Sequence, residues 1–175
     1  MSLAAARQSI FITGAASGMG RETARLFHQQ GWFIGAFDVN QAGLEALQAE
    51  LGAENCLIGQ LDVSDKAAYE RAVNAFDEAT GGRMDILFNN AGIAMRGFFD
   101  EIPFDEQMRI VQVNFVGVLN GIHTALPLLK ATPNALCFTT SSSSRGVCIA
   151  GADSYRHARR CAAGRRIGQR RVPRY

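Results

Sequence analysis

Residues 9–22 read Ser9-Ile10-Phe11-Ile12-Thr13-Gly14-Ala15-Ala16-Ser17-Gly18-Met19-Gly20-Arg21-Glu22, and this stretch decides the fold of the chain. Its apolar run at 10–12 is typical of a strand buried on both faces. A glycine pattern, G-x-x-x-G-x-G, separates that strand from a helical pattern whose inner side carries Thr23, Ala24, Leu26 and Phe27. A glycine turn between strand and helix lets backbone N–H groups approach a pyrophosphate. The stretch therefore predicts dinucleotide-binding residues at Gly14, Ser17, Gly18, Met19 and Gly20, with an ordinary glycine-rich turn as the alternative.

Length and composition favour a single globular domain. The chain has 175 residues and 47% hydrophobic content, enough for one sizeable core. It shows no apolar run of the ~20 residues that a membrane span needs, and its first residues do not resemble a signal peptide. Its four cysteines, at 56, 137, 148 and 161, form no C-x-x-C pair. We therefore expect no metal site, no membrane association, reduced cysteines and a cytoplasmic location.

Strand and helix patterns alternate along the chain. Strands are predicted at 10–12, 32–37, 56–61, 85–88 and 135–140, with helices between them. Ser64 is expected to cap the helix after the third strand. The last helix is expected to run from about 104 to 130, with Leu119 among its core positions and a bend at Pro127. This alternation predicts an α/β fold of three layers, with a doubly wound parallel sheet.

An aspartate stands at the end of the second predicted strand. Asp38 lies 18 residues after Gly20, where an acidic side chain can bind the adenosine ribose hydroxyls and repel a 2′-phosphate. Val39 and Asn40 carry no positive charge for such a phosphate. The position favours NAD over NADP, and a simple turn aspartate is the alternative.

Further motifs follow in order: Asp62-Val63, Asn89-Asn90-Ala91-Gly92, Asn114 within Val113-Asn114-Phe115, and a serine cluster at 141–144. With the glycine pattern, they make residues 8–144 similar to the short-chain dehydrogenase/reductase family. The resemblance implies a Rossmann fold and an NAD(H)-dependent oxidoreductase that interconverts small-molecule alcohols and carbonyls by hydride transfer. Methyltransferases share glycine-rich turns, but they have no counterpart for Asn89–Gly92 or Asn114.

The resemblance also implies roles for single residues. Asp62 and Val63 would flank the adenine ring. The cofactor cleft would be lined by Asn90, Ala91 and Gly92. Three catalytic residues are implied: Asn114, which would bend the long helix and help hold a water in a proton relay; Ser142, which would polarise the substrate carbonyl; and Tyr155, the general acid/base. We choose Ser142 over Ser141 and Ser143 because it stands thirteen residues before Tyr155, close to the family spacing.

One position departs from the family pattern. The family has a lysine four residues after the tyrosine, and its charge lowers the phenol pKa from ~10 toward neutrality. Here that position is Arg159, which supplies charge without the compact ammonium. We therefore expect little or no turnover, and Tyr155 could match by coincidence. A second hypothesis is a non-catalytic NAD-binding remnant or regulatory module.

The charge balance changes sharply near residue 144. Residues 1–144 carry 9 basic and 15 acidic residues, a net −6, whereas residues 145–175 carry nine arginines against one aspartate, a net +8. We predict a Rossmann domain at 1–144 and an atypical Arg-rich tail at 145–175 that is disordered or read out of frame.

The tail also affects what we expect of the last strands of the sheet and of binding partners. The last strands of the family pattern are not recognisable in it, nor is the helix through which family members usually form homo-oligomers, so the fifth strand is expected to be an edge. A nucleic-acid-binding role for the arginines is the alternative, disfavoured because the tail offers few aromatic side chains for stacking.

Overall fold

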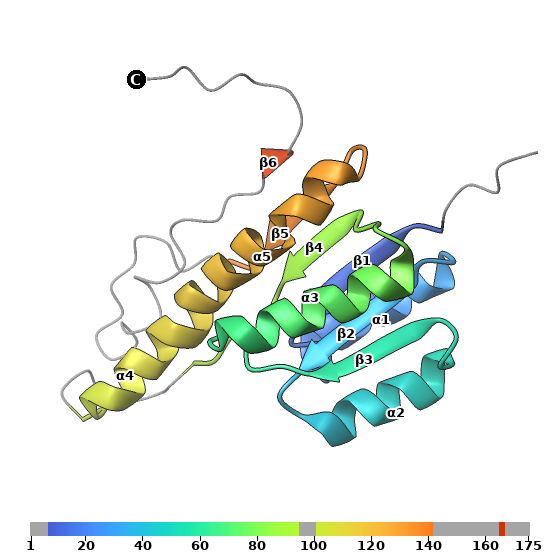
Figure 1. The fold of residues 1–175 in the computed structure, drawn as a ribbon. Helices are drawn as coiled ribbons and strands as arrows, with labels where there is room; N and C mark the ends of the chain where they lie inside the picture. Colours follow the sequence, from blue (N-terminus) through green and yellow to red (C-terminus); the bar gives the residue numbers. More distant parts are fainter. Residues whose placement is uncertain (1–6, 95–100, 142–164, 167–175) are drawn as a thin grey trace, which may run out of the picture.

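A single sheet forms the centre of the molecule. The computed structural model describes residues 7–94, 101–141 and 165–166, and its strands lie in the order β3-β2-β1-β4-β5-β6 (Figure 1). The strands are β1 (Ser9–Thr13), β2 (Phe33–Asp38), β3 (Cys56–Gln60), β4 (Ile86–Asn89), β5 (Leu136–Thr139) and β6 (Arg165–Arg166). The first five pair in parallel, which confirms the predicted doubly wound parallel sheet.

Helices cover both faces of this sheet (Figure 1). They are α1 (Gly18–Gln29), α2 (Gln41–Leu51), α3 (Lys66–Thr80), α4 (Phe104–Val111), the π-helical segment η1 (Gln112–Val116) and α5 (Gly117–Ala131). Because side chains alternate along a strand, Ile10 and Ile12 pack in the core beneath α1 and α2, while Phe11 packs beneath α3 and α5. Burial on both sides explains the continuous apolar run in the first strand.

The core beneath α3 is largely aromatic. The ring of Phe11 stacks on Phe37 at a centroid distance of 4.2 Å and meets Phe76 edge-on at 5.4 Å. Tyr69 stacks on the same ring at 5.8 Å and is fully buried. Aromatic pairs of this kind add about 0.5–1.5 kcal/mol each beyond their buried area, so this cluster fixes α3 against the first two strands.

The cap of α3 differs from the prediction. Asp65, not Ser64, caps the helix, and its carboxylate accepts from the Ala68 N–H at 3.0 Å. The Ser64 hydroxyl instead donates to Asp62 Oδ1 at 2.6 Å. Since that hydroxyl is engaged in the turn after β3, the helix begins one residue later than expected.

The long helix predicted over 104–130 is interrupted. Its α-helical pattern changes to a π-helical one at Gln112–Val116, around the buried Asn114. Two predicted core positions are also wrong, because Leu119 on α5 and Leu26 on α1 are 50% and 53% exposed. Helical spacing alone did not distinguish these flanking positions from the buried stripe.

The Arg-rich tail lies mostly outside the described residues, so its predicted disorder, its reading frame and its nucleic-acid alternative stay untested. Its described part, β6, pairs antiparallel with β5, placing Arg166 opposite Leu136 and Arg165 opposite Cys137. This strand was not predicted from the sequence, and it occupies part of the β5 edge that we expected to be open. A strand edge offers unpaired backbone groups, so even a two-residue segment can dock there.

In the ranges that the structure describes, no helix is long and apolar enough to cross a membrane, and no group of histidine, cysteine and acidic residues could hold a metal ion.

Cys56 and Cys137 are free thiols. Burial raises the pKa of Cys56 to about 12, so this thiol stays protonated at neutral pH.

The two leucine environments can be compared directly. Leu44 on α2 is fully buried, whereas Leu26 on α1 is half exposed. Leu44→Ala should lower the free energy of unfolding by about 2–5 kcal/mol, and Leu26→Ala by no more than about 0.5 kcal/mol. Urea denaturation measures both changes, and equal losses would contradict the assigned packing of the α1–α2 layer.

Candidate functional site

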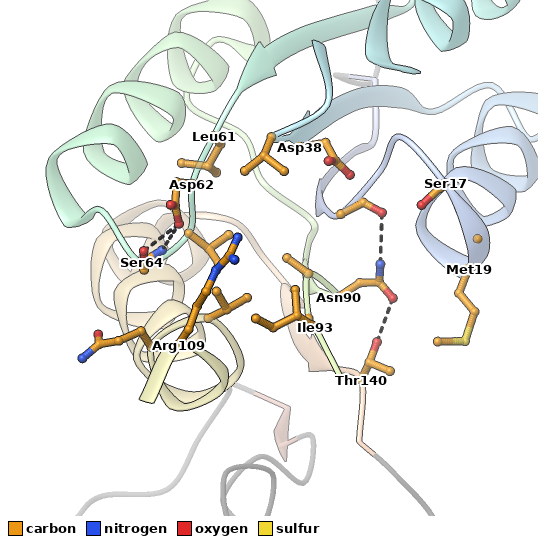
Figure 2. Close-up of a pocket in the computed structure, with 18 of the residues that line it drawn as sticks. Ser17, Met19, Asp38, Leu61, Asp62, Ser64, Asn90, Ile93, Arg109 and Thr140 are labelled. Carbon is orange, nitrogen blue, oxygen red and sulfur yellow. Dashed lines mark hydrogen bonds between the residues drawn. The ribbon is translucent and has the colours of Figure 1, made fainter. Parts of the chain in front are cut away.

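A cleft of about 720 Å³ opens at the carboxyl ends of the parallel strands (Figure 2). In doubly wound sheets this edge is where ligands bind. The cleft is lined by ten of the residues predicted to bind the cofactor: Gly14, Ser17, Gly18, Met19, Asp38, Asp62, Val63, Asn90, Ala91 and Gly92. The fold thus gathers four separate motifs into one cavity.

The glycine turn is tightly packed against the end of β4. Gly14 has φ +69°, and a Cβ there would lie 2.9 Å from Ala91 Cα. Gly20 lies behind the cleft lining, where a Cβ would collide with the Gly14 carbonyl oxygen and lie 2.8 Å from Asn90 Nδ2. Any larger residue at position 20 would therefore push the turn away from the sheet.

Asn90 connects three strand ends. Its Nδ2 donates to the carbonyl oxygens of Thr13 and Gly14 at 3.1 and 3.2 Å. Its Oδ1 accepts from Thr140 Oγ1 at 3.0 Å, as Figure 2 shows. The hydroxyl of Thr13 accepts in turn from the N–H groups of Asn90 and Ala91, both at 3.1 Å. These bonds fix the glycine turn to β4 and β5.

The carboxylate of Asp38 is held at the end of β2. Its Oδ2 accepts from the Ala16 N–H in the glycine turn, and its Oδ1 accepts from the Asn40 N–H, both at 3.0 Å. A carboxylate has about four acceptor positions, so capacity remains for hydroxyl donors in the cleft. The structure therefore places a fixed negative charge beside the glycine turn.

The wall of the cleft away from Asp38 is formed by the segment that follows β3 and by α4. Asp62 accepts at Oδ1 from the N–H and the hydroxyl of Ser64, at 2.9 and 2.6 Å. On the same side, α4 contributes Asp105 and Arg109 to the lining, and Figure 2 shows Arg109 on the side of the cleft where Asp62 lies. Arg109 is the only basic residue among those that line the cleft in the described part of the chain.

Asn114 does not line the cleft but holds a residue that does. Its buried side chain pairs with the backbone of Ile93 in both directions, Nδ2 donating to the carbonyl oxygen and Oδ1 accepting from the N–H, each at 2.8 Å. Ile93 follows the Asn90–Gly92 motif and lines the cleft. The observed role of this side chain is thus to anchor the segment after β4, and the predicted water relay remains untested.

Two predicted catalytic residues, Ser142 and Tyr155, lie outside the described residues. Sequence reasoning also missed half of the lining: Val39, Leu61, Ser64, Ile93, Asp105, Met108, Arg109, Gln112, Val113 and Thr140. Several directly follow or flank a motif residue at a strand end, a proximity that could have identified them. Those at 105, 108, 109 and 112 share i, i+3, i+4, i+7 spacing on one helical face, but their mixed polarity gives no apolar pattern.

Comparison with known proteins agrees with this architecture. The family model for short chain dehydrogenase matches residues 8–160, beyond residue 144, where we expected the resemblance to end, and through Tyr155. The chain is 34% identical over 137 residues to meso-2,3-butanediol dehydrogenase of Serratia marcescens, covering 78% of this chain and 54% of that protein. It thus spans about half the length of the curated relatives that it matches.

Solved structures with bound cofactors are similar too. A short-chain dehydrogenase/reductase of Burkholderia phymatum in complex with NAD has a TM-score of 0.80 at 28% identity, covering 85% of this chain and 54% of that one. An alcohol dehydrogenase of Thermococcus sibiricus complexed with 5-hydroxy-NADP has a TM-score of 0.79 at 26% identity, covering 85% and 64%. Together with the cleft and its motifs, these matches show that the chain belongs to the short chain dehydrogenase family of oxidoreductases.

Proposed function

We propose that the cleft binds NAD(H), with the adenosine half between Asp38 and Asp62. The observation that carries the proposal is the fixed Asp38 carboxylate, which the Ala16 N–H holds beside the glycine turn at 3.0 Å. The residues present fit such a group, because Gly18 lines the cleft and, apart from its own neighbours in the chain, no protein atom lies within 4 Å of the place that a Cβ would occupy there. The first backbone N–H groups of α1 lack helical partners, and the Ser17 side chain does not cap them.

The charges in the cleft support NAD over NADP. A 2′-phosphate on the adenosine ribose would approach the Asp38 carboxylate, and its neighbours Val39 and Asn40 are uncharged. Among the described residues that line the cleft, Arg109 is the single cation, and it stands on α4 across the cleft from Asp38 rather than on β2. The phosphate would thus meet repulsion without a compensating charge, while ribose hydroxyls would find acceptors.

The reaction class follows from family membership, and the residue roles are part of the proposal. The bound nicotinamide supplies hydride acceptance and donation. In alcohol oxidation, Tyr155 takes the hydroxyl proton as the carbinol carbon loses hydride, and Ser142 donates a hydrogen bond to the developing carbonyl. Asn114 keeps the cleft wall at Ile93 in place through its paired 2.8 Å hydrogen bonds.

A binding function without turnover is the second candidate. It is favoured by Arg159, which replaces the lysine of the family pattern four residues after Tyr155. A guanidinium lacks the compact, titratable ammonium that lowers the phenol pKa and exchanges protons. The adenosine side of the cleft is complete in the described residues, so this candidate retains NAD binding and loses catalysis.

Cofactor choice is tested by removing the Asp38 carboxylate. Asp38→Ala should raise the affinity for NADP relative to NAD by roughly tenfold, because the repulsion of the 2′-phosphate is removed. Asp105→Ala is the matched control, since it removes the same charge from the α4 wall and should leave the ratio unchanged. Calorimetric titration with both dinucleotides measures the ratios, and the same ratio in Asp38→Ala as in wild type would refute the assigned role.

Turnover separates the two candidate functions. We expect calorimetry to show NAD binding, and NADH formation with a panel of secondary alcohols to be very slow, because Arg159 replaces the lysine. Tyr155→Phe should remove whatever activity is present without changing NAD affinity. Rapid NADH formation by the wild-type chain would exclude the non-catalytic candidate, and activity that survives Tyr155→Phe would exclude Tyr155 as the acid/base.

A further inference from the structure

A buried polar cluster lies in the core between α3, β4, α5 and β5. The Tyr69 hydroxyl donates to Asn89 Oδ1 at 3.0 Å, and Asn89 Nδ2 donates to Cys137 Sγ at 3.8 Å. Tyr69 is fully buried and Asn89 is only 4% exposed. Burial also raises the pKa of Tyr69 well above its usual value, so the hydroxyl remains a hydrogen-bond donor at every physiological pH.

Gly121 on α5 leaves room for the side chains of Tyr69 and Asn89. A Cβ on Gly121 of α5 would lie 2.5 Å from the Tyr69 hydroxyl oxygen and would also collide with Asn89 Oδ1. An alanine there would therefore displace one of the two partners. Asn89 needs both contacts, since an unsatisfied amide in this core would carry a large desolvation cost.

Asn89 links this core cluster to the cleft. Its backbone carbonyl accepts from the Thr140 N–H at 3.0 Å, and its neighbour Asn90 accepts from the Thr140 hydroxyl at the same distance. Thr140 lines the cleft and, in Figure 2, lies on the far side of Asn90 from Asp38. It stands two residues before Ser142. Asn89 therefore contacts the cysteine of β5 through its side chain and Thr140, the residue after β5, through its backbone, and both contacts help to fix where that strand ends beside the cleft.

We propose that Tyr69 is a positioning residue for the half of the cleft away from Asp38: by holding the Asn89 side chain, it places Thr140 against the nicotinamide end of the dinucleotide. The proposal rests on the proposed NAD-binding function. It assigns a site role to a core tyrosine that touches neither cofactor nor substrate. Its effect is local, because the Asn90 bonds to Thr13 and Gly14 on the adenosine side do not involve Tyr69.

The decisive variant is Tyr69→Phe, which keeps the ring packed on Phe11 and removes only the hydroxyl. We expect the Kd for NAD to rise roughly three- to tenfold, the effect of one buried hydrogen bond, while the Kd for ADP-ribose changes by less than about twofold. The Thr140 amide should exchange its hydrogen about tenfold faster without ligand. Gly121→Ala perturbs the same contact from α5 and should give the same pattern.

The matched control is Thr132→Val. Thr132 Oγ1 is buried and accepts from the Met84 N–H at 3.0 Å, at the opposite end of β4 from the cleft. This variant should lower stability to a similar extent and leave the affinities for NAD and ADP-ribose unchanged. Comparing it with Tyr69→Phe distinguishes positioning from general loss of stability.

These measurements distinguish a failure of the proposed NAD-binding function from a failure of the positioning role of Tyr69. No NAD binding by the wild-type chain would overturn the proposed function, and this inference with it. NAD binding that is unchanged in Tyr69→Phe, or weakened equally for NAD and ADP-ribose, would overturn the positioning role alone. A weakening selective for NAD, together with faster exchange at Thr140, supports it.

Discussion

The hydrogen bonds of the Asn90 side-chain amide hold the other parts of the site in place. This amide bonds to the carbonyl oxygens of Thr13 and Gly14 on one side and to the Thr140 hydroxyl on the other. Each such bond is worth only about 1 kcal/mol net, but together they fix the glycine turn and the end of β5 to the centre of the sheet. Gly20 is required for the same reason, because a Cβ would contact this amide.

The consecutive residues Asn89 and Asn90 thus make hydrogen bonds in two different parts of the molecule, the core and the cleft. Asn90 faces the glycine turn, while Asn89 faces the core cluster that contains the Tyr69 hydroxyl. Successive residues of a strand point to opposite faces, so this pair links the hydrophobic core directly to the cleft. Thr140 donates one hydrogen bond to each asparagine, from its N–H to Asn89 and from its hydroxyl to Asn90. The position of the β5 end therefore depends on the core as well as on the site.

Local patterns predicted most of the framework. The apolar run at 10–12 and the leucines of α2 indicated buried elements, because burial imposes a strict spacing on apolar residues. The α4 wall with Arg109 was missed, since its lining residues share a helical spacing but differ in polarity and so form no apolar stripe. The π-helical turn around Asn114 depends on the contact with Ile93, a tertiary interaction that residue type alone does not reveal.

We propose that the Asn90 amide organises a cleft that binds NAD. This role is tested most directly by calorimetric titration of NAD into the wild-type chain and into Asn90→Asp, which keeps the side-chain shape and replaces the amide donor with a carboxylate. Circular dichroism establishes that both are folded. We expect a clear NAD binding isotherm for the wild type and none for the variant, because the new carboxylate faces two carbonyl oxygens and repels the glycine turn. Equal NAD affinity in the two folded proteins would contradict it.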